Sequence, residues 1–309
     1  MKEEFILNNL RIKYKVISVK RLPELQADID KTEQDGNLSN LKLFRPYIND
    51  FKFRVPENFP EAKYIVVLAI EHNLAKVNFH LNGQKHNIIL PHDYHRLGAS
   101  VEELAELVEK EIIKEAGFKV EHNRTMHLKL LAVRSGLGRY GRNNICYVDG
   151  LGSFLSLYAF FTDYDFQVDN WYDLRMLEDC EYCSICSDNC PTQAIPHIDD
   201  DEFIIDVERC LTLHNEKLGE FPEWLRSDAH NSLIGCTRCQ QYCPANTKVI
   251  EKIIQLEDIT EEETKMILDG RIEEHLSLSI GRKLRIFDDI KNAEYPIPLI
   301  KRNLELLLD

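Results

Sequence analysis

Eight cysteines form two groups whose spacing is typical of iron–sulfur ligation. The first group reads C-x2-C-x2-C-x3-C-P and ends at Pro191, and the second is Cys210 followed by a C-x2-C-x3-C-P run that ends at Pro244. The first spacing places three thiolates around one [4Fe–4S] cubane and directs the fourth to a different cluster. We therefore predict two [4Fe–4S] clusters. The first has the ligands Cys180, Cys183, Cys186 and Cys243, and the second has Cys190, Cys210, Cys236 and Cys239.

Disulfides and zinc are the alternative uses for these cysteines. A chain of 309 residues in which we expect no signal segment argues against a disulfide framework. Zinc ribbons use two C-x2-C pairs and need neither the third cysteine of each run nor the cysteine–proline pair that follows. The spacing favours the clusters over both alternatives.

Composition and charge limit the location and the partners of the chain. It is 44% apolar and 29% charged, as in ordinary soluble proteins, and its net charge is −14. Lysine and arginine drive general binding to nucleic acid by displacing counterions from phosphates, so this charge disfavours tRNA as a partner. No uninterrupted apolar stretch approaches the ~18 residues needed to cross a bilayer. We expect a cytoplasmic protein that has no contact with a membrane.

Apolar patterns and turn residues predict the secondary structure. Residues 64–70 form a β-branched run typical of a buried strand, and residues 77–90 predict a β-hairpin that turns at Asn82-Gly83. Ser100 and Glu103 form a capping box that opens a helix ending at Gly117. A second helix is expected up to residue 136, with strands at 145–148 and 154–161. Further on, a capping box at residues 260–263 predicts a helix that ends at residue 270.

These elements predict an α+β fold with an α/β-like N-terminal domain. We expect this domain over residues 1–170, where it would bind cobalamin and substrate. A ferredoxin-like domain with two [4Fe–4S] clusters is expected over 171–250, and a short helical tail over 251–309. The N-terminal domain is much larger than a plain ferredoxin needs. That size favours an enzyme over a simple electron carrier.

A glycine segment precedes the cysteines. Gly136, Gly138 and Gly141 match G-x-G-x-x-G, and Arg142 and Asn143 follow them. In a dinucleotide-binding site a strand precedes the glycines and a helix follows them. Here a helix is predicted before the glycines and a strand after them, so the pattern does not support nicotinamide binding.

Several segments together resemble the epoxyqueuosine reductase family and, more distantly, the reductive dehalogenases. They are the glycine segment from 132 to 143, the strand 152–163, both cysteine runs, and the Arg209-Cys210 pair. The resemblance covers about residues 122–246, is looser over 260–288, and is poor over the first 60 residues. The chain ends about where family members continue into helical repeats that help to hold tRNA, which indicates a shorter paralogue.

The resemblance implies a mechanism, a second cofactor and partners. In this family electrons pass one at a time through the two clusters to a base-off cobalamin, which carries the difficult chemistry on the substrate. By resemblance, Gly136, Gly138, Gly141, Arg142 and Asn143 would lie beside the corrinoid. The partners would be an external electron donor such as a ferredoxin or flavodoxin, and a small-molecule or modified-nucleoside substrate.

The sequence departs from the family at the expected proton donor. Family members carry an aspartate twelve residues before the position of Arg134, and this chain has His122 there. Histidine can donate a proton near neutral pH, so we take His122 as the candidate catalytic residue, with Glu121 as a substitute. The change also indicates a substrate other than tRNA-borne epoxyqueuosine.

Five other residues are considered for a chemical role. Asp93 and His95 match D-x-H-x-x-G, a loop whose histidine binds cobalt in certain cobalamin domains, but the remaining parts of that motif are absent from the sequence. His214 could tune a cluster through a hydrogen bond. Cys146 is interpreted as a buried thiol and Trp224 as a packing anchor between the two cluster halves.

Three classes of function therefore stay open. The first is a cobalamin- and cluster-dependent reductase, which we favour because of the large first domain. The second is an electron-transfer protein that has clusters but no cobalamin, or that activates a corrinoid protein, and the absent aspartate favours it. The third is a regulatory module that senses redox state.

Overall fold

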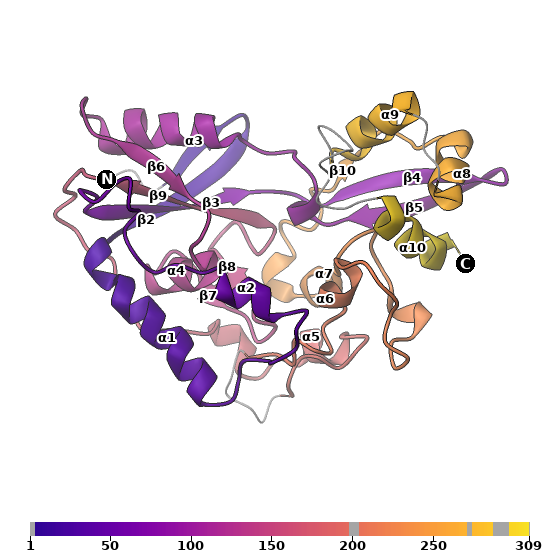
Figure 1. Ribbon diagram of the computed structural model, residues 1–309, viewed down its shortest axis with the longest axis horizontal. Helices are drawn as coiled ribbons and strands as arrows, with labels where there is room; N and C mark the ends of the chain where they lie inside the picture. Colours follow the sequence, from indigo (N-terminus) through magenta and orange to yellow (C-terminus); the bar gives the residue numbers. More distant parts are fainter. Residues whose placement is uncertain (1–3, 198–203, 271–273, 287–296, 309) are drawn as a thin grey trace. The chain divides into compact units, whose positions relative to one another are not determined.

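A computed structural model describes residues 4–197, 204–270, 274–286 and 297–308 (Figure 1). The chain divides into two compact units, each built from separate stretches of sequence. Unit 1 contains residues 1–71, 98–184 and 196–205, and unit 2 contains residues 72–97, 185–195 and 206–309.

Unit 1 is built on a five-stranded antiparallel sheet. Its strand order is β1-β2-β3-β9-β6, with these bounds: β1 Glu4–Leu7, β2 Leu10–Ser18, β3 Tyr64–Glu71, β9 Leu155–Thr162 and β6 Val120–Asn123. Strand β3 lies in the middle, and its residues from Ile65 onward are buried on both faces. The predicted buried strand is therefore confirmed, and its unbroken β-branched run is explained by burial on both faces.

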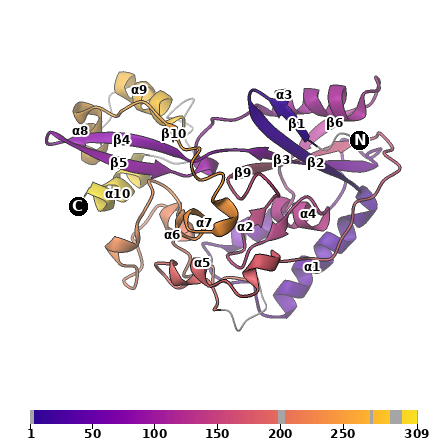
Figure 2. The same ribbon diagram turned by 180° about the vertical axis from the view of Figure 1, so that it is seen from behind.

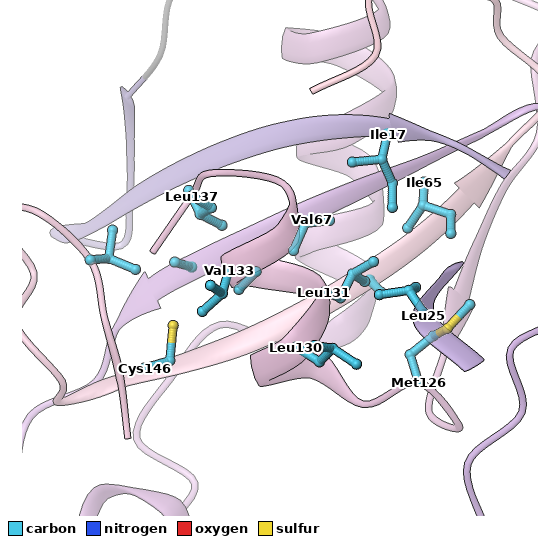
Figure 3. Close-up of a cluster of buried hydrophobic side chains, with 14 of the residues drawn as sticks. Ile17, Leu25, Ile65, Val67, Met126, Leu130, Leu131, Val133, Leu137 and Cys146 are labelled. Atoms are coloured by element: carbon cyan, nitrogen blue, oxygen red, sulfur yellow. The ribbon is translucent and has the colours of Figure 1, made fainter. Parts of the chain in front are cut away.

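Alternate residues of the strands supply the two cores of unit 1. Ile65 and Val67 of β3 face one core, whereas Val66 and Leu68 face the other, as the period of two in a strand requires. Helices α1 (Leu22–Gln34) and α4 (Leu128–Arg134) contribute to the first core, where Leu130, Leu131 and Val133 of α4 pack with the strand residues (Figure 3). Helix α3 (Val101–Leu107) contributes to the second core.

Helix α3 begins as predicted but ends earlier. The Ser100 hydroxyl accepts a hydrogen bond from the Glu103 backbone N–H, and the Glu103 carboxylate accepts one from the Ser100 N–H, which confirms the capping box. The helix continues as a π-helical stretch, Val108–Ile113, and stops at Lys114 in the left-handed conformation (φ 63°). The predicted end at Gly117 is therefore wrong by one turn, because Lys114 already supplies the reversal that a terminal glycine usually provides.

Unit 2 contains a second sheet of three strands. Strands β4 (Ala75–Leu81) and β5 (Gln84–Leu90) form the predicted hairpin, and the short strand β10 (Ile254–Gln255) pairs with β4 in parallel. Asn82 and Gly83 both have positive φ, as a tight two-residue hairpin turn requires.

Three C-terminal helices complete the apolar core of unit 2 with this hairpin (Figure 2). Their bounds are α8 Glu261–Asp269, α9 Glu274–Leu284 and α10 Ile297–Leu308. Thr260 caps α8 and Gly270 ends it with φ 69°, both as predicted. Within the described residues, no helix is long and apolar enough to cross a membrane.

The α+β class is confirmed, but the compact units have a different outline from the three predicted segments. Residues 72–97, expected in the N-terminal domain, share a core with the helices of the predicted tail. Strand pairing between β4 and β10 and the burial of Val77 and Phe79 against Ile267 and Ile300 account for this arrangement. The division into a cofactor-binding, a cluster-binding and a tail segment stays a prediction.

Candidate iron–sulfur centre

The cysteines of unit 2 lie on or beside very short helices. Cys186 is in α5 (Ile185–Asp188) and Cys239 is in α7 (Arg238–Gln241), which packs against α5. Cys210 directly precedes α6 (Leu211–Asn215). A proline follows Cys190 and another follows Cys243, and proline cannot continue a helix from the preceding turn. The helices therefore stay short, and loops position the thiols between them.

Three of these thiols are close enough to influence one another electrostatically. The pKa of Cys210 is raised to about 11, mainly by burial and in part by the neighbouring thiols Cys236 and Cys190. The pKa of Cys236 is also raised, first by burial and then in part by Cys190. Thiolates that disfavour each other in this way are those that a bound cation would stabilise. They are three of the four ligands predicted for the second cluster.

Hydrogen-bond donors point at two of these sulfurs. The backbone N–H of Ala194 donates to Cys190 Sγ at 3.2 Å, and the Asn231 side-chain amide donates to Cys236 Sγ at 3.2 Å. The hydroxyl of Thr192 lies 3.6 Å from Cys190 Sγ. Such donors stabilise cluster thiolates, so the donor set fits a [4Fe–4S] cluster.

A single metal ion is the alternative occupant of this group. In the described part of the chain, no three His, Cys, Asp or Glu side chains are arranged to hold one ion. A cubane spreads its thiolates over four iron atoms rather than one. The choice between zinc and the clusters rests on the cysteine spacing.

Residues around Cys210 hold its loop in place. Arg209 donates from Nε to the Thr192 carbonyl at 2.8 Å, and its guanidinium lies over the Trp224 ring, 5.1 Å from the centroid. The His214 ring also lies against Trp224, and its Nε2 contacts the Glu208 carbonyl at 2.7 Å. Trp224 thus packs against the Cys210 loop, and the His214 contacts are with the protein backbone and an aromatic ring.

Cys180 and Cys183 belong to unit 1, where Arg142 holds the Cys180 backbone. The Arg142 side chain is almost fully buried, at 1% exposure. Its Nη2 donates to the Cys180 carbonyl at 2.8 Å and its Nη1 to the His197 carbonyl at 3.2 Å. Because the ligands predicted for the first cluster come from both units, that set stays a prediction from the spacing.

The glycine segment follows helix α4 and leads into a small hairpin of β7 (Arg139–Tyr140) and β8 (Cys146–Tyr147). The predicted order, with a helix before the glycines and a strand after them, is therefore confirmed. A Cβ at Gly138 would lie 2.6 Å from Cys146 Sγ and 2.8 Å from the Tyr147 carbonyl oxygen. A Cβ at Gly141 would lie 2.6 Å from the Tyr147 ring. Both glycines are therefore required by close packing within the chain.

The rest of the segment is also engaged by its own chain. Gly136 has φ 70°, and a Cβ there would lie 2.6 Å from the Tyr172 ring. Asn143 is buried and donates to the Tyr147 hydroxyl at 2.9 Å. Neighbouring residues of the same chain therefore contact each of these five positions. Their assignment to a corrinoid stays a prediction.

His122 lies in β6 between aromatic rings. Its ring centroid is 5.8 Å from that of Tyr158 and 5.2 Å from that of Phe160. Burial lowers the pKa of His122, and the nearby Arg124 lowers it further. A histidine with this pKa is neutral at pH 7 and carries little of the acidic form that a proton donor needs. Its catalytic role stays a prediction.

Glu121 is no stronger as a proton donor. Lys119 forms an ion pair with its carboxylate at 2.8 Å, and Asn58 donates to it at 2.8 Å. The Lys119 hydrogen bond is the main reason that its pKa is lowered, so the carboxylate is ionised at neutral pH.

His95 is engaged within unit 2. Its Nδ1 is 3.2 Å from Nε2 of His72, and its Nε2 is 2.9 Å from the carbonyl oxygen of Asn73. The side chain is 3% exposed. Both ring nitrogens therefore face protein atoms.

Two residues near these cysteines have contacts that their sequence context does not indicate. Arg142 was assigned to the corrinoid, whereas its contacts are with the carbonyls of the Cys180 loop. Asn231 was not selected at all, because a single asparagine five residues before a cysteine has no motif that could single it out.

Comparisons with known proteins agree with the cysteine assignment. Residues 179–246 match the family model of the 4Fe–4S double cluster binding domain. The chain is 34% identical to the epoxyqueuosine reductase of Pseudomonas aeruginosa over 160 residues, which are 51% of this chain and 42% of that protein. It is 29% identical to that of Cellulophaga algicola over 157 residues, 50% of this chain and 49% of that protein. The chain therefore spans about half the length, or less, of these curated relatives.

Solved structures extend the likeness to nearly the whole chain. The epoxyqueuosine reductase of Streptococcus thermophilus matches 96% of this chain and 76% of its own, with a TM-score of 0.62 and 17% identity. An epoxyqueuosine reductase bound to an epoxyqueuosine-modified tRNA-Tyr stem loop matches 96% of this chain and 76% of its own, with a TM-score of 0.64 and 20% identity. The predicted resemblance is confirmed, in sequence over half of the chain and in fold over almost all of it.

Proposed function

We propose that this protein is an iron–sulfur oxidoreductase, similar to epoxyqueuosine reductases, that carries electrons through two [4Fe–4S] clusters. The observation that carries the proposal is the group formed by Cys190, Cys210 and Cys236 inside the segment that matches the double cluster domain. Three close thiols, two of which accept N–H hydrogen bonds at sulfur, are the donors that such clusters use.

The protein's own residues would hold the clusters and control their surroundings. When bound, each cluster supplies a one-electron transfer step. The eight cysteines provide the ligands, and Ala194 and Asn231 donate hydrogen bonds to their sulfurs. Arg142 fixes the Cys180 loop through two backbone carbonyls. An external donor such as a ferredoxin or flavodoxin would deliver the electrons.

The finer proposal is a reductase whose substrate differs from tRNA-borne epoxyqueuosine. One relative was solved with an epoxyqueuosine-modified tRNA stem loop. This chain has a net charge of −14, and His122 stands where the family resemblance leads us to expect an aspartate. Both features favour a small molecule or a modified nucleoside over a tRNA. Cobalamin enters this proposal through the family relationship alone.

A second candidate is an electron-transfer protein that works without its own cobalamin. The observation that favours it is the glycine segment, where Tyr172, Cys146 and Tyr147 occupy the space next to the three glycines. Such a protein would pass electrons to a separate acceptor, for example to reactivate a corrinoid protein.

Anaerobic reconstitution with iron, sulfide and hydroxocobalamin, followed by gel filtration, tests the proposal and separates the two candidates. About eight irons per chain are expected, because two cubanes contain four each. Corrinoid absorbance that travels with the protein would support the reductase, and iron without corrinoid would support the electron-transfer protein. A chain that holds zinc, or about four irons at saturation, would contradict the two-cluster proposal itself.

A further inference from the structure

We infer that Asn231 raises the reduction potential of the cluster bound by Cys236. This inference rests on the proposed function, because it concerns one of the proposed clusters. Asn231 is not a ligand in any predicted set, so its role would be to position a dipole against a ligand sulfur. Its Nδ2 lies 3.2 Å from Cys236 Sγ.

Two backbone groups fix which end of the Asn231 amide faces the sulfur. The backbone N–H of Thr237 can only donate, and it lies 3.0 Å from the amide oxygen Oδ1. The carbonyl of Ala229 can only accept, and it lies 3.0 Å from the amide nitrogen Nδ2. Exchanging the two amide atoms would break both bonds, so the NH₂ group is the one that points at Cys236.

The surroundings hold the amide in place. Thr237 and Ser232 are fully buried, and Ala229 is 3% exposed. The Thr237 hydroxyl lies 3.3 Å from Asn231 Oδ1 as a second donor to the same oxygen. Because backbone groups hold both ends of the amide, it does not need to reorganise when the charge on the cluster changes, so it is a pre-oriented donor.

Charge on the sulfur links this hydrogen bond to the potential. One-electron reduction adds a negative charge to the cluster and its thiolates, and the electron comes from the external donor. A hydrogen bond to a charged acceptor is stronger than one to a less charged acceptor, so the Asn231 N–H stabilises the reduced state more than the oxidised state. Hydrogen bonds to cluster sulfurs are among the factors that set these potentials. The Cys236 cluster would therefore be easier to reduce with this hydrogen bond than without it.

The experiment measures the midpoint potentials of both clusters by anaerobic redox titration followed by EPR. Asn231→Asp keeps the size and the Thr237 acceptor but replaces the donor by an oxygen. We expect the potential of one cluster to fall by about 59 mV, which is a tenfold change in a one-electron reduction equilibrium. The potential of the other cluster should stay unchanged. Asn231→Ala removes the donor without adding a charge, and should give a fall in the same direction.

Thr237→Val is the matched control. It removes the hydroxyl that contacts Asn231 Oδ1 but leaves the backbone donor and the amide–sulfur bond, so both potentials should stay unchanged. If Asn231→Ala holds about eight irons and neither potential moves, the inference is overturned, whereas the proposal of two clusters is retained. The same conclusion follows if Asn231→Asp loses its cluster but Asn231→Ala keeps the wild-type potentials. Failure of the wild-type chain to form clusters would instead overturn the proposed function.

Discussion

The cysteine group of unit 2 and the glycine segment of unit 1 use their residues in opposite ways. Cys190, Cys210 and Cys236 are brought together although they lie up to 46 residues apart, and burial together with the neighbouring thiols raises the pKa of Cys210 and that of Cys236. In the glycine segment, neighbouring residues of the same chain pack against Gly138, and Nη1 and Nη2 of Arg142 donate to backbone carbonyls.

The difference shows which kind of sequence signal predicts a site. Cysteine spacing reflects the geometry of the ligand itself, so it survives in any fold that binds the cluster. Glycines permit close approach of any group, whether it is a cofactor or a neighbouring side chain. Here the approaching groups are Cys146 Sγ and the Tyr147 ring, so the same pattern indicates packing.

The largest expected effect separates ligand cysteines from packing cysteines. Cys210→Ser should lower iron after reconstitution from about eight to about four per chain, because the second cluster loses a ligand. Cys146→Ala should keep about eight, because this thiol is buried against the glycine segment and burial raises its pKa to about 12. Iron and sulfide analysis checks both variants. Equal iron in the two variants would contradict the distinction.

Arg142 tests whether the glycine segment supports the cluster loop. Arg142→Met keeps most of the volume but leaves the carbonyls of Cys180 and His197 without this donor, which should cost about 3 kcal/mol of unfolding free energy. Arg139→Met is the matched control in the same segment. Its two ion pairs, at 3.7 and 3.8 Å, join it to exposed carboxylates, so the loss should stay below about 1 kcal/mol. Urea unfolding followed by circular dichroism measures both.

Gly138→Ala tests the packing explanation of the glycines. The added methyl would overlap Cys146 Sγ and the Tyr147 carbonyl, which should destabilise the protein by about 1–3 kcal/mol. At Gly98 a Cβ meets no atom within 4 Å, so Gly98→Ala should be nearly neutral. Adding Cys146→Ala to Gly138→Ala should recover part of the loss, as a double-mutant cycle would show. Strictly additive effects would argue against the contact.

The smallest expected effect concerns His122. Because its pKa is lowered in the folded state, the unfolded state takes up this proton first as the pH falls. The contribution of neutral His122 to stability is therefore fully present above about pH 6.5 and is lost as the pH falls toward its folded pKa. An NMR titration of the oxidised protein should give a pKa below 6.5, and His122→Gln should reduce the loss of stability between pH 7 and pH 5. A pKa above 6.5 would restore His122 as a proton donor.

Much of the fold was predictable because it depends on local patterns. The apolar run at residues 64–70 predicted strand β3, and the Asn82-Gly83 turn predicted the β4–β5 hairpin. Thr260 and Gly270 predicted the two ends of α8. The helix that ends at Lys114 was misjudged, since a lysine in the left-handed conformation leaves no sign in the sequence. The joining of residues 72–97 to the C-terminal helices was also hidden, because it depends on contacts across more than 150 residues.

The sequence by itself determined the cluster chemistry, since the number and spacing of thiolates are properties of the ligand set and need no knowledge of the surrounding fold. Only the tertiary structure decided what surrounds those thiolates. It places the Asn231 amide against Cys236 and the Arg142 guanidinium against the Cys180 carbonyl, and it fills the space beside the glycines with side chains. The physical reason is that hydrogen bonds and close packing depend on distances of a few ångströms between residues far apart in the chain.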